Sequence, residues 1–342
     1  MKAVAMQAAL PSHDPRSLQD VTLPDPVPGA RDLLVEVRAV SVNPVDTKVR
    51  ASAQVPPGEW KVLGWDAVGV VRAVGHAVSL FKPGDRVWYA GAIDRPGTNA
   101  QLHLVDERIA ALAPQSLDDA HAAALPLTAI TAWELLFDRL GARPGAQAVP
   151  GEALLVVGVA GGVGSVLVQL ARQLTDLTVI GTASRAETAQ WVQQLGAHHV
   201  LDHSQPLDAA LRAAGLPAPS RIASLTHSAQ HFGPLAQLIA PQGRLGLIDD
   251  PEPGSLNVNL LKTKAASLHW EFMFTRSLFQ TPDMLAQHTL LTEVARLVDA
   301  GRLHSTLSEH AGSINAANLR RAHAGLESGR TRGKVVLEGF DD

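Results

Sequence analysis

The stretch Glu152–Thr175, EALLVVGVAGGVGSVLVQLARQLT, decides the fold of this chain. It begins with an uninterrupted apolar run, Ala153–Val157, which is typical of a strand buried on both faces. Glycines follow this run, and apolar residues then recur at helical spacing. The glycines are Gly158, Gly161 and Gly164 at even spacing, with Gly162 among them. The stretch therefore predicts a strand, a glycine turn and a helix.

This glycine turn favours the binding of a phosphate group. Glycine adopts backbone angles that a Cβ forbids, and it lets a ligand approach the main chain closely. The helix that follows offers free N–H groups and the positive end of its dipole to an anion, here expected to be a pyrophosphate. The spacing is GxxGxxG rather than GxGxxG, and the flanking strand and helix are the context that supports the assignment. The alternative is a glycine-rich turn in an ordinary α/β domain.

Composition narrows the class of protein. The chain has 342 residues, for which two domains are the natural expectation. Its net charge of -4 and lack of a basic run argue against binding to nucleic acid or to an anionic membrane. It has no cysteine, which excludes disulfides and thiolate metal sites. No long apolar run or signal peptide is evident, so we expect a cytoplasmic enzyme.

The pattern of elements predicts an α/β fold with two different domains. Residues 1–125 show many short strands separated by Gly and Pro, Gly64–His76 reading as a glycine-punctuated pair, which suggests a small barrel-like domain. A helical period starts at Asp118 and is interrupted by Pro126. From Glu152 strands and helices alternate, which is the signature of a doubly wound parallel sheet. The further strands expected there are Leu177–Ala183, His198–Asp202, Ile222–Thr226, Arg244–Ile248 and Ser267–Phe274.

The C-terminal part is expected to return to the first domain. We predict a helix over Pro282–Ala300, a short β segment at Arg302–Thr306 and a last strand at Lys334–Leu337. The predicted domains are thus residues 1–125 with 275–342, and residues 126–274.

The end of the second strand of the sheet selects the dinucleotide. An acid there would bind a ribose 2′-hydroxyl and repel a 2′-phosphate. This chain instead has Ser184 and Arg185, about twenty residues past Gly164. A hydroxyl and a guanidinium suit a phosphate, which favours NADPH over NADH. Alternatively, Ser184 caps the next helix with Arg185 solvated, or Glu187 turns back to the ribose.

Several motifs resemble the medium-chain dehydrogenase/reductase superfamily over the whole length of the chain, closest to its zinc-free quinone oxidoreductase branch, which includes zinc-type alcohol dehydrogenase-like members. The matching stretches are Val42–Asp46 (VNPVD), Gly64–Val71 (GWDAVGVV), Gly84–Val87 (GDRV), Leu125–Ala132 (LPLTAITA), Ala160–Gly164 (AGGVG) and Gly333–Val336 (GKVV). The resemblance implies a GroES-like β-rich catalytic domain split in sequence around a Rossmann domain. It also implies NADPH as hydride donor and, commonly, a homodimer.

The resemblance also predicts that no metal is bound. Zinc-dependent relatives place a Cys where Asn43 stands and a His-Glu pair where Trp65 and Asp66 stand, and they carry a Cys-rich loop for a second zinc. None of these is present. Without zinc to polarise a carbonyl, the substrate should already be electrophilic, as quinones and α,β-unsaturated carbonyls are. We therefore expect NADPH-dependent reduction of such a small molecule in a dry cleft.

The catalytic candidates are Asn43 and Tyr89. By resemblance, Asn43 lies beside the nicotinamide and the substrate, where its amide can donate to a carbonyl oxygen; alternatively it only fixes the turn before Pro44. Tyr89, the only tyrosine, can donate to the substrate or pack as an ordinary strand residue. Asp46 is expected to order the following helix rather than transfer protons. No residue stands out as the proton donor.

Further residues are candidate contacts of the cofactor. With the glycine turn and the second strand end, the candidates are Asn43, Thr131, Gly158, Gly161, Gly162, Val163, Gly164, Ser184, Arg185, His203, Ile248, Phe272, Phe274 and Lys334. Simpler interpretations are open for several of them: a structural threonine, apolar core residues and a solvated turn at Lys334. Two rival functions also remain, reduction of enoyl thioesters or other activated alkenes and non-catalytic binding of NADPH.

Overall fold

The computed structural model describes residues 1–145 and 151–341 and divides the chain into two compact units. Unit 1 consists of Met1–Ile130 and Phe274–Asp342, and unit 2 consists of Thr131–Met273. The sequence placed these boundaries at 125/126 and 274/275. In the structure the first division lies between Ile130 and Thr131, inside the helix α3 (Pro126–Trp133).

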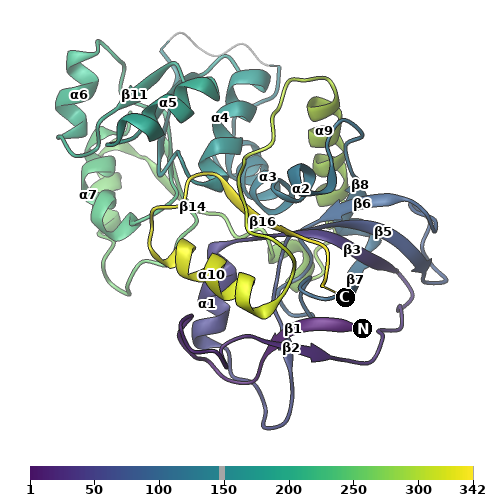
Figure 1. The fold of residues 1–342 in the computed structure, drawn as a ribbon. Helices are drawn as coiled ribbons and strands as arrows, with labels where there is room; N and C mark the ends of the chain where they lie inside the picture. The colour runs from purple at the N-terminus through teal and green to yellow at the C-terminus, as the bar shows by residue number, and fades with distance from the viewer. Residues whose placement is uncertain (146–150, 342) are drawn as a thin grey trace. The chain divides into compact units, whose positions relative to one another are not determined.

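Unit 1 is built on two β-sheets (Figure 1). Within the described residues, the larger sheet has the order β15-β16-β3-β5-β6-β8, with β7 also paired to β3. A smaller sheet has the order β2-β1-β4. The strands are β1 (Lys2–Met6), β2 (Gln19–Thr22), β3 (Asp32–Val42), β4 (Lys61–Val62), β5 (Ala67–Val74), β6 (Arg86–Tyr89), β7 (Leu102–Asp106), β8 (Ala110–Leu112), β15 (Leu307–His310) and β16 (Lys334–Glu338).

Helices surround these sheets. They are α1 (Pro44–Ser52), η1 (Glu107–Ile109), α2 (Asp119–Ala123), α8 (Thr275–Leu278), α9 (Ala286–Asp299) and α10 (Ala316–Glu327). Helices α1 and α10 lie side by side although they come from opposite ends of the chain (Figure 1). A buried arginine of α1, Arg50, forms an ion pair with Glu327 at the end of α10.

Two local predictions in unit 1 differ from the structure, and one helix has no counterpart among the predicted elements. Gly64–His76 contains one strand, β5, rather than a pair, because β5 pairs with β3 on one side, with a register shift at Arg72, and its first residues pair with β6 on the other. The β segment expected at Arg302–Thr306 lies later, at β15, where Leu307 pairs with Lys334. Helix α10 was not predicted; its signals are Asn315, whose side chain accepts the Asn318 N–H at 2.8 Å, and buried residues at helical spacing.

Unit 2 is a doubly wound parallel sheet, as the sequence predicts. Its strand order is β11-β10-β9-β12-β13-β14, and every pairing is parallel. Numbered from the first strand this order is 3-2-1-4-5-6, that of dinucleotide-binding folds. The strands are β9 (Ala153–Val157), β10 (Thr178–Thr182), β11 (His199–Leu201), β12 (Arg221–Ser224), β13 (Arg244–Leu247) and β14 (Ser267–Trp270). The helical segments are η2 (Glu134–Arg139), α4 (Gly162–Leu174), α5 (Ala186–Gln194), α6 (Leu207–Ala213), α7 (Ser228–Leu238) and η3 (Val258–Lys264).

The apolar helical run Asp119–Arg139 belongs to the protein interior. Its length and composition would allow it to cross a membrane, but 83% of its apolar window is buried inside the protein. This degree of burial is typical of a core helix. The run ends in η2, which is wound as a π-helix.

A pair of acids is buried between η2 and the end of β14. Glu271 is 3% exposed and accepts a hydrogen bond from the Arg139 guanidinium at 2.9 Å. Burial and the neighbouring Glu134 raise the pKa of Glu271 well above its usual range. The folded protein therefore keeps a proton here that the unfolded chain releases, so the stability of unit 2 falls as pH rises from the unfolded pKa toward the folded one.

Replacing Glu271 with glutamine is expected to remove this loss. Glutamine keeps the acceptor for Arg139 and carries no titrating group, so the free energy of unfolding should decline less steeply between about pH 6 and pH 9. One titrating group changes the slope by up to about 1.4 kcal/mol per pH unit. Urea denaturation at several pH values measures it. Glu293→Gln is the control, because Glu293 is a half-buried acid that pairs with Arg296 and has a lowered pKa, so this variant should keep the parental dependence of the free energy of unfolding on pH. Equal slopes in the parent and both variants would contradict the buried proton.

Candidate functional site

The glycine turn of unit 2 has the geometry of a phosphate-binding turn. Gly158 follows β9 with a φ of +79°, a left-handed conformation that favours glycine. Gly161 precedes the first residue of α4 as its N-cap. A Cβ on Gly161 would meet only the Gly158 carbonyl oxygen, at 3.5 Å, so the space above this residue is open. Gly164 instead lies against the backbone of Val159, which holds α4 close to the turn.

The other cofactor candidates of unit 2 follow the strand ends. Ser184 and Arg185 come after β10, His203 after β11, Ile248 after β13 and Phe272 after β14. Because the strands are parallel, their carboxyl ends form one edge of the sheet, the edge where open α/β sheets bind ligands. The structure thus brings these residues and the glycine turn to the same edge of unit 2, and their contacts with a cofactor stay a prediction.

The two residues that should choose the dinucleotide are exposed. Arg185 occupies the N-cap position of α5, and its guanidinium lies 3.3 Å from the Glu187 carboxylate. Both side chains face solvent and Ser184 is exposed beside them. No side-chain hydrogen bond caps α5, so the alternative in which Ser184 caps this helix is not what the described residues form. The guanidinium remains available to an anion at this edge.

The remaining candidates belong to a different region of the chain. Asn43, Tyr89, Phe274 and Lys334 lie in unit 1, whereas Thr131 is buried at the first residue of unit 2. Phe274 is buried, with its ring edge-on to Trp65 at a centroid distance of 6.3 Å. Sequence alone gave no reason to place them together beyond the family resemblance.

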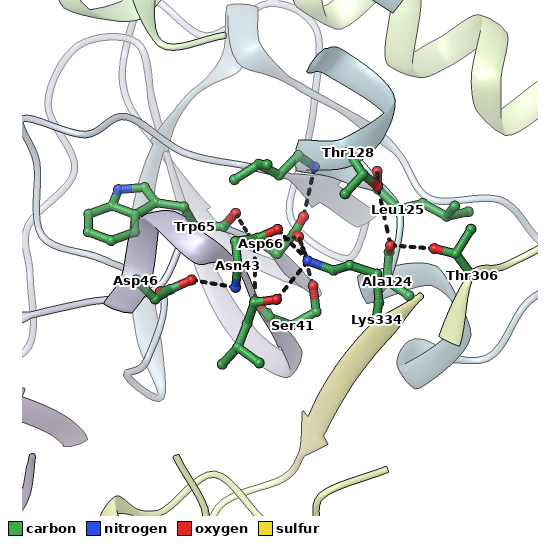
Figure 2. A network of polar contacts seen from close by, with 12 residues as sticks. Ser41, Asn43, Asp46, Trp65, Asp66, Ala124, Leu125, Thr128, Thr306 and Lys334 are labelled. Atoms are coloured by element: carbon green, nitrogen blue, oxygen red, sulfur yellow. Dashed lines mark hydrogen bonds and ion pairs between the residues drawn. The ribbon is translucent and has the colours of Figure 1, made fainter. Parts of the chain in front are cut away.

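A buried polar cluster in unit 1 joins Asn43, Asp66 and Lys334 (Figure 2). The Asp66 carboxylate is fully buried. Its Oδ2 accepts hydrogen bonds from Ser41 Oγ at 2.7 Å, Asn43 Nδ2 at 2.9 Å and Lys334 Nζ at 3.2 Å. Its Oδ1 accepts the Leu127 backbone N–H at 2.8 Å, at the start of α3. Burial raises the pKa of Asp66, whereas the Lys334 charge and the hydrogen bonds from these donors favour its ionised form.

Lys334 has partners other than those the sequence suggested. Its ammonium donates to the Val42 carbonyl oxygen at 2.8 Å, to Asp66 Oδ2 and to Asn43 Oδ1. Burial lowers the pKa of Lys334, and the Asp66 charge opposes this shift. An ammonium has three N–H bonds, and all three have acceptors inside unit 1. The predicted contact of Lys334 with cofactor phosphate is therefore replaced by an internal one, because no donor remains for the phosphate.

Asn43 is held at several atoms. Its Oδ1 accepts from Lys334, its Nδ2 donates to Asp66, and its backbone N–H donates to Asp46 Oδ2 at 2.7 Å. Asn43 is the N-cap of α1, so the geometry includes the turn before Pro44 that was its alternative role. Burial raises the pKa of Asp46 to about 7. Asp46 orders the start of α1, as expected.

Tyr89 is a buried strand residue whose hydroxyl contacts His103. The Tyr89 oxygen lies 3.1 Å from His103 Nδ1, and the two rings are stacked with centroids 5.4 Å apart. Burial raises the pKa of Tyr89 and lowers the pKa of His103 to about 4. The arrangement matches the packed alternative for Tyr89, and its catalytic role stays a prediction.

The residues of the cluster do not fit zinc. Zinc is bound by thiolate, imidazole and carboxylate groups, usually with four ligands in structural sites and three protein ligands in catalytic ones. Here the corresponding positions carry an amide at Asn43 and an indole at Trp65, whose N–H donates to the Ala92 carbonyl oxygen at 3.2 Å. Of these three positions only Asp66 carries a side chain that binds zinc, and it already pairs with the Lys334 ammonium; the neighbouring Asp46 carboxylate accepts the Asn43 backbone N–H. Among the residues that the structure describes, no group of three or more His, Cys, Asp or Glu side chains could hold a metal ion.

Asp66 and Lys334 are the functional candidates that sequence reasoning underrated. Asp66 was noted only as a motif residue, and Lys334 was assigned to the cofactor. The available signal was a charged residue next to an apolar strand in both GWDAVGVV and GKVVL. Charged groups are rarely buried unless paired, so two such positions suggest partners.

Comparison with known proteins gives the family. Residues 29–114 match the alcohol dehydrogenase GroES-like domain, and residues 195–337 match the zinc-binding dehydrogenase family. A zinc-type alcohol dehydrogenase-like protein of Staphylococcus aureus is 38% identical over 91% of this chain and 92% of its own length. A quinone oxidoreductase of Pseudomonas aeruginosa is 31% identical, with 91% and 92% covered. A crystal structure from Rhizobium etli CFN 42, of a protein named as a candidate zinc-dependent alcohol dehydrogenase, is 58% identical with a TM-score of 0.95, covering 100% and 99% of the two chains. The chain therefore belongs to the quinone oxidoreductase-like branch of the medium-chain dehydrogenase/reductase superfamily, whose members are NAD(P)H-dependent oxidoreductases.

Proposed function

We propose that this protein reduces a quinone or another α,β-unsaturated carbonyl with NADPH, and that it does so without zinc. The observation that carries the proposal is the set of side chains at positions 43, 65 and 66: an amide, an indole and a carboxylate that is already paired with Lys334. The relatives bear both kinds of name, zinc-type alcohol dehydrogenase-like and quinone oxidoreductase. The side chains of this chain favour the second.

The proposed substrate class follows from chemistry. NADPH, when bound, supplies a hydride. A metal would polarise a simple ketone and stabilise the alkoxide, and the residues that the structure describes include no ligand set for one. The acceptor must then be electrophilic by itself, as quinones and enones are. The chain's own groups bind the cofactor at the glycine turn, orient the two flat ring systems and exclude water.

A turnover assay with the full chain tests this function. Oxidation of NADPH is followed with 1,4-benzoquinone, with 2-cyclohexen-1-one and, as a simple carbonyl, with cyclohexanone. We expect turnover with the first two and little with the third. Binding of NADPH without turnover of any acceptor would favour the non-catalytic alternative, and preference for cyclohexanone would overturn the substrate class.

Metal removal is expected to leave this activity intact. Dialysis against a chelator should not change kcat, because the cluster contains no ligand set for zinc. The measurement is turnover before and after dialysis, with metal content determined on the same samples. Activity that is lost on dialysis and restored by zinc would contradict the proposal.

The preference for NADPH is expected to depend on Arg185. Arg185→Asp replaces an exposed cation with an anion beside Glu187, so it should raise KM for NADPH about 10- to 100-fold, the loss of one charge-assisted phosphate contact. KM for NADH should change much less. Arg212→Asp is a matched control, since Arg212 is another exposed arginine of unit 2 with a local acidic partner, Asp208. Equal effects of Arg185→Asp on both cofactors would remove the phosphate assignment.

The proposed functional form is a homodimer. Strand β14 is an edge of the unit 2 sheet, and its unpaired side offers backbone donors and acceptors to a second copy. Exposed apolar side chains lie on this strand and just after it: Trp270 is 51% exposed and Phe272 is 46% exposed. Pairing of two β14 strands would cover them. Light scattering of the purified chain measures the assembly.

A further inference from the structure

We propose that Lys334 supplies the positive charge of the buried cluster and is a positioning residue for Asn43. The structural part of this inference stands on unit 1 alone. Its consequence for turnover rests on the proposed function.

Three neighbouring strands bring the cluster together. Strand β16 pairs with β3 so that Val335 lies opposite Val42, and β3 pairs with β5 so that Val40 lies opposite Ala67. Lys334 is the first residue of β16, and Asp66 directly precedes β5. These registers place an ammonium and a carboxylate at the end of β3, where the chain turns into Asn43 (Figure 2).

The ammonium is the group that fixes the Asn43 amide. An amide can present either its oxygen or its nitrogen to a neighbour, but a lysine ammonium can only donate, so the group facing Lys334 must be the oxygen. This leaves Nδ2 toward Asp66, which can only accept. The side chain of Asn43 thus has one orientation in which both partners are satisfied. A neutral residue at position 334 would remove this selection.

The ammonium is also the cation that balances Asp66. Lys334 is 3% exposed and Asp66 is 0% exposed, so water compensates neither charge. The third N–H of Lys334 goes to the Val42 carbonyl oxygen, so the three acceptors around it are all oxygen atoms. The positive charge among these oxygen atoms is that of the Lys334 ammonium. A metal ion would have to displace that charge.

Three variants separate positioning from simple charge balance. Lys334→Arg keeps a cation. Lys334→Met removes it and leaves Asp66 unbalanced, so this variant can fail to fold. Lys334→Met combined with Asp66→Asn removes both charges together and keeps a polar side chain at position 66, so Asp66 is not left as an unpaired buried charge.

The direct readout is hydrogen exchange of the Asn43 side-chain amide. In protein labelled with 15N-asparagine its signals are assigned by their absence from Asn43→Ser. We expect protected signals in the parent and in Lys334→Arg, and exchange about tenfold faster or more in the double variant, the loss of about one hydrogen bond. Protection that persists in the double variant would overturn the inference, and so would its loss in Lys334→Arg.

Turnover gives an independent readout. With 1,4-benzoquinone as acceptor, kcat of the double variant should fall about 100-fold, the effect of a misplaced group, while KM for NADPH changes less. Full turnover in a stable double variant would mean that Lys334 only balances Asp66, which also overturns the inference. The exchange measurement needs no substrate. Failure of the proposed function would therefore appear as absent turnover in the parent, with the exchange pattern unaffected.

Discussion

Replacing Lys334 with methionine is expected to lower the free energy of unfolding by about 3–5 kcal/mol, the cost of breaking a buried ion pair from one side. The variant leaves the Asp66 carboxylate buried without its cation. It also leaves Asn43 Oδ1 and the Val42 carbonyl oxygen without their donor. Each of these changes lowers the free energy of unfolding. Urea denaturation followed by circular dichroism measures the total.

The double variant Lys334→Met with Asp66→Asn should recover the part of this loss that comes from the unbalanced Asp66 charge. Removing both charges of a buried pair is often close to neutral, because the desolvation cost of each ion disappears with it. The coupling between the two substitutions is then large, as it is for residues in direct contact. An exposed pair gives the matched control: Arg212→Met, opposite Asp208, should leave the free energy of unfolding nearly unchanged. Equal losses in the single and double Lys334 variants would contradict a charge-balanced cluster.

Alanine at Gly164 and alanine at Gly161 are expected to fail in different ways. A Cβ on Gly164 would lie 2.5 Å from the Cα and carbonyl oxygen of Val159, and backbone atoms cannot rotate away. Gly164→Ala should therefore destabilise unit 2 by about 3 kcal/mol, near the upper end of the range for overpacking. Thermal and urea denaturation measure this loss.

Gly161→Ala should instead leave stability unchanged and weaken cofactor binding. Its φ of -73° suits any residue, and the nearest atom to its Cβ is the Gly158 carbonyl oxygen at 3.5 Å. The added methyl group would fill the space through which a pyrophosphate reaches the helix N-terminus. We expect the dissociation constant of NADPH to rise about 10- to 100-fold, which corresponds to about 1.4–2.8 kcal/mol. Unchanged NADPH affinity in Gly161→Ala would exclude this turn as the binding site.

The parts of the fold that were predictable from the sequence have local patterns. Ala153–Val157, the glycine turn and α4 follow one another directly, so the sequence pattern that predicts them lies within about two dozen residues. The alternation that follows predicts the parallel sheet because strands buried on both faces read as apolar runs. Ser267–Phe274 shows the limit of such signals. It was expected as one strand, but β14 ends at Trp270 and Phe274 already belongs to unit 1.

The family motifs also identified the region of unit 1 that holds the buried cluster, but they did not predict the contacts between its residues. VNPVD, GWDAVGVV and GKVV each contain one member of the buried cluster. From the motifs alone, two roles remained open for Asn43, and Lys334 was a candidate contact of the cofactor phosphate. Which charges are paired depends on contacts between these motifs, and no property of one motif reports the neighbours of another.

The sequence by itself determined the doubly wound sheet and the glycine turn between its first strand and helix, since each depends on residue types within a short segment. Only the tertiary structure decided that Lys334 meets Asn43, 291 residues away, and Asp66. The physical reason is strand pairing: the registers of β16 on β3 and of β3 on β5 bring these side chains to one buried place, where an unbalanced charge would be too costly to keep.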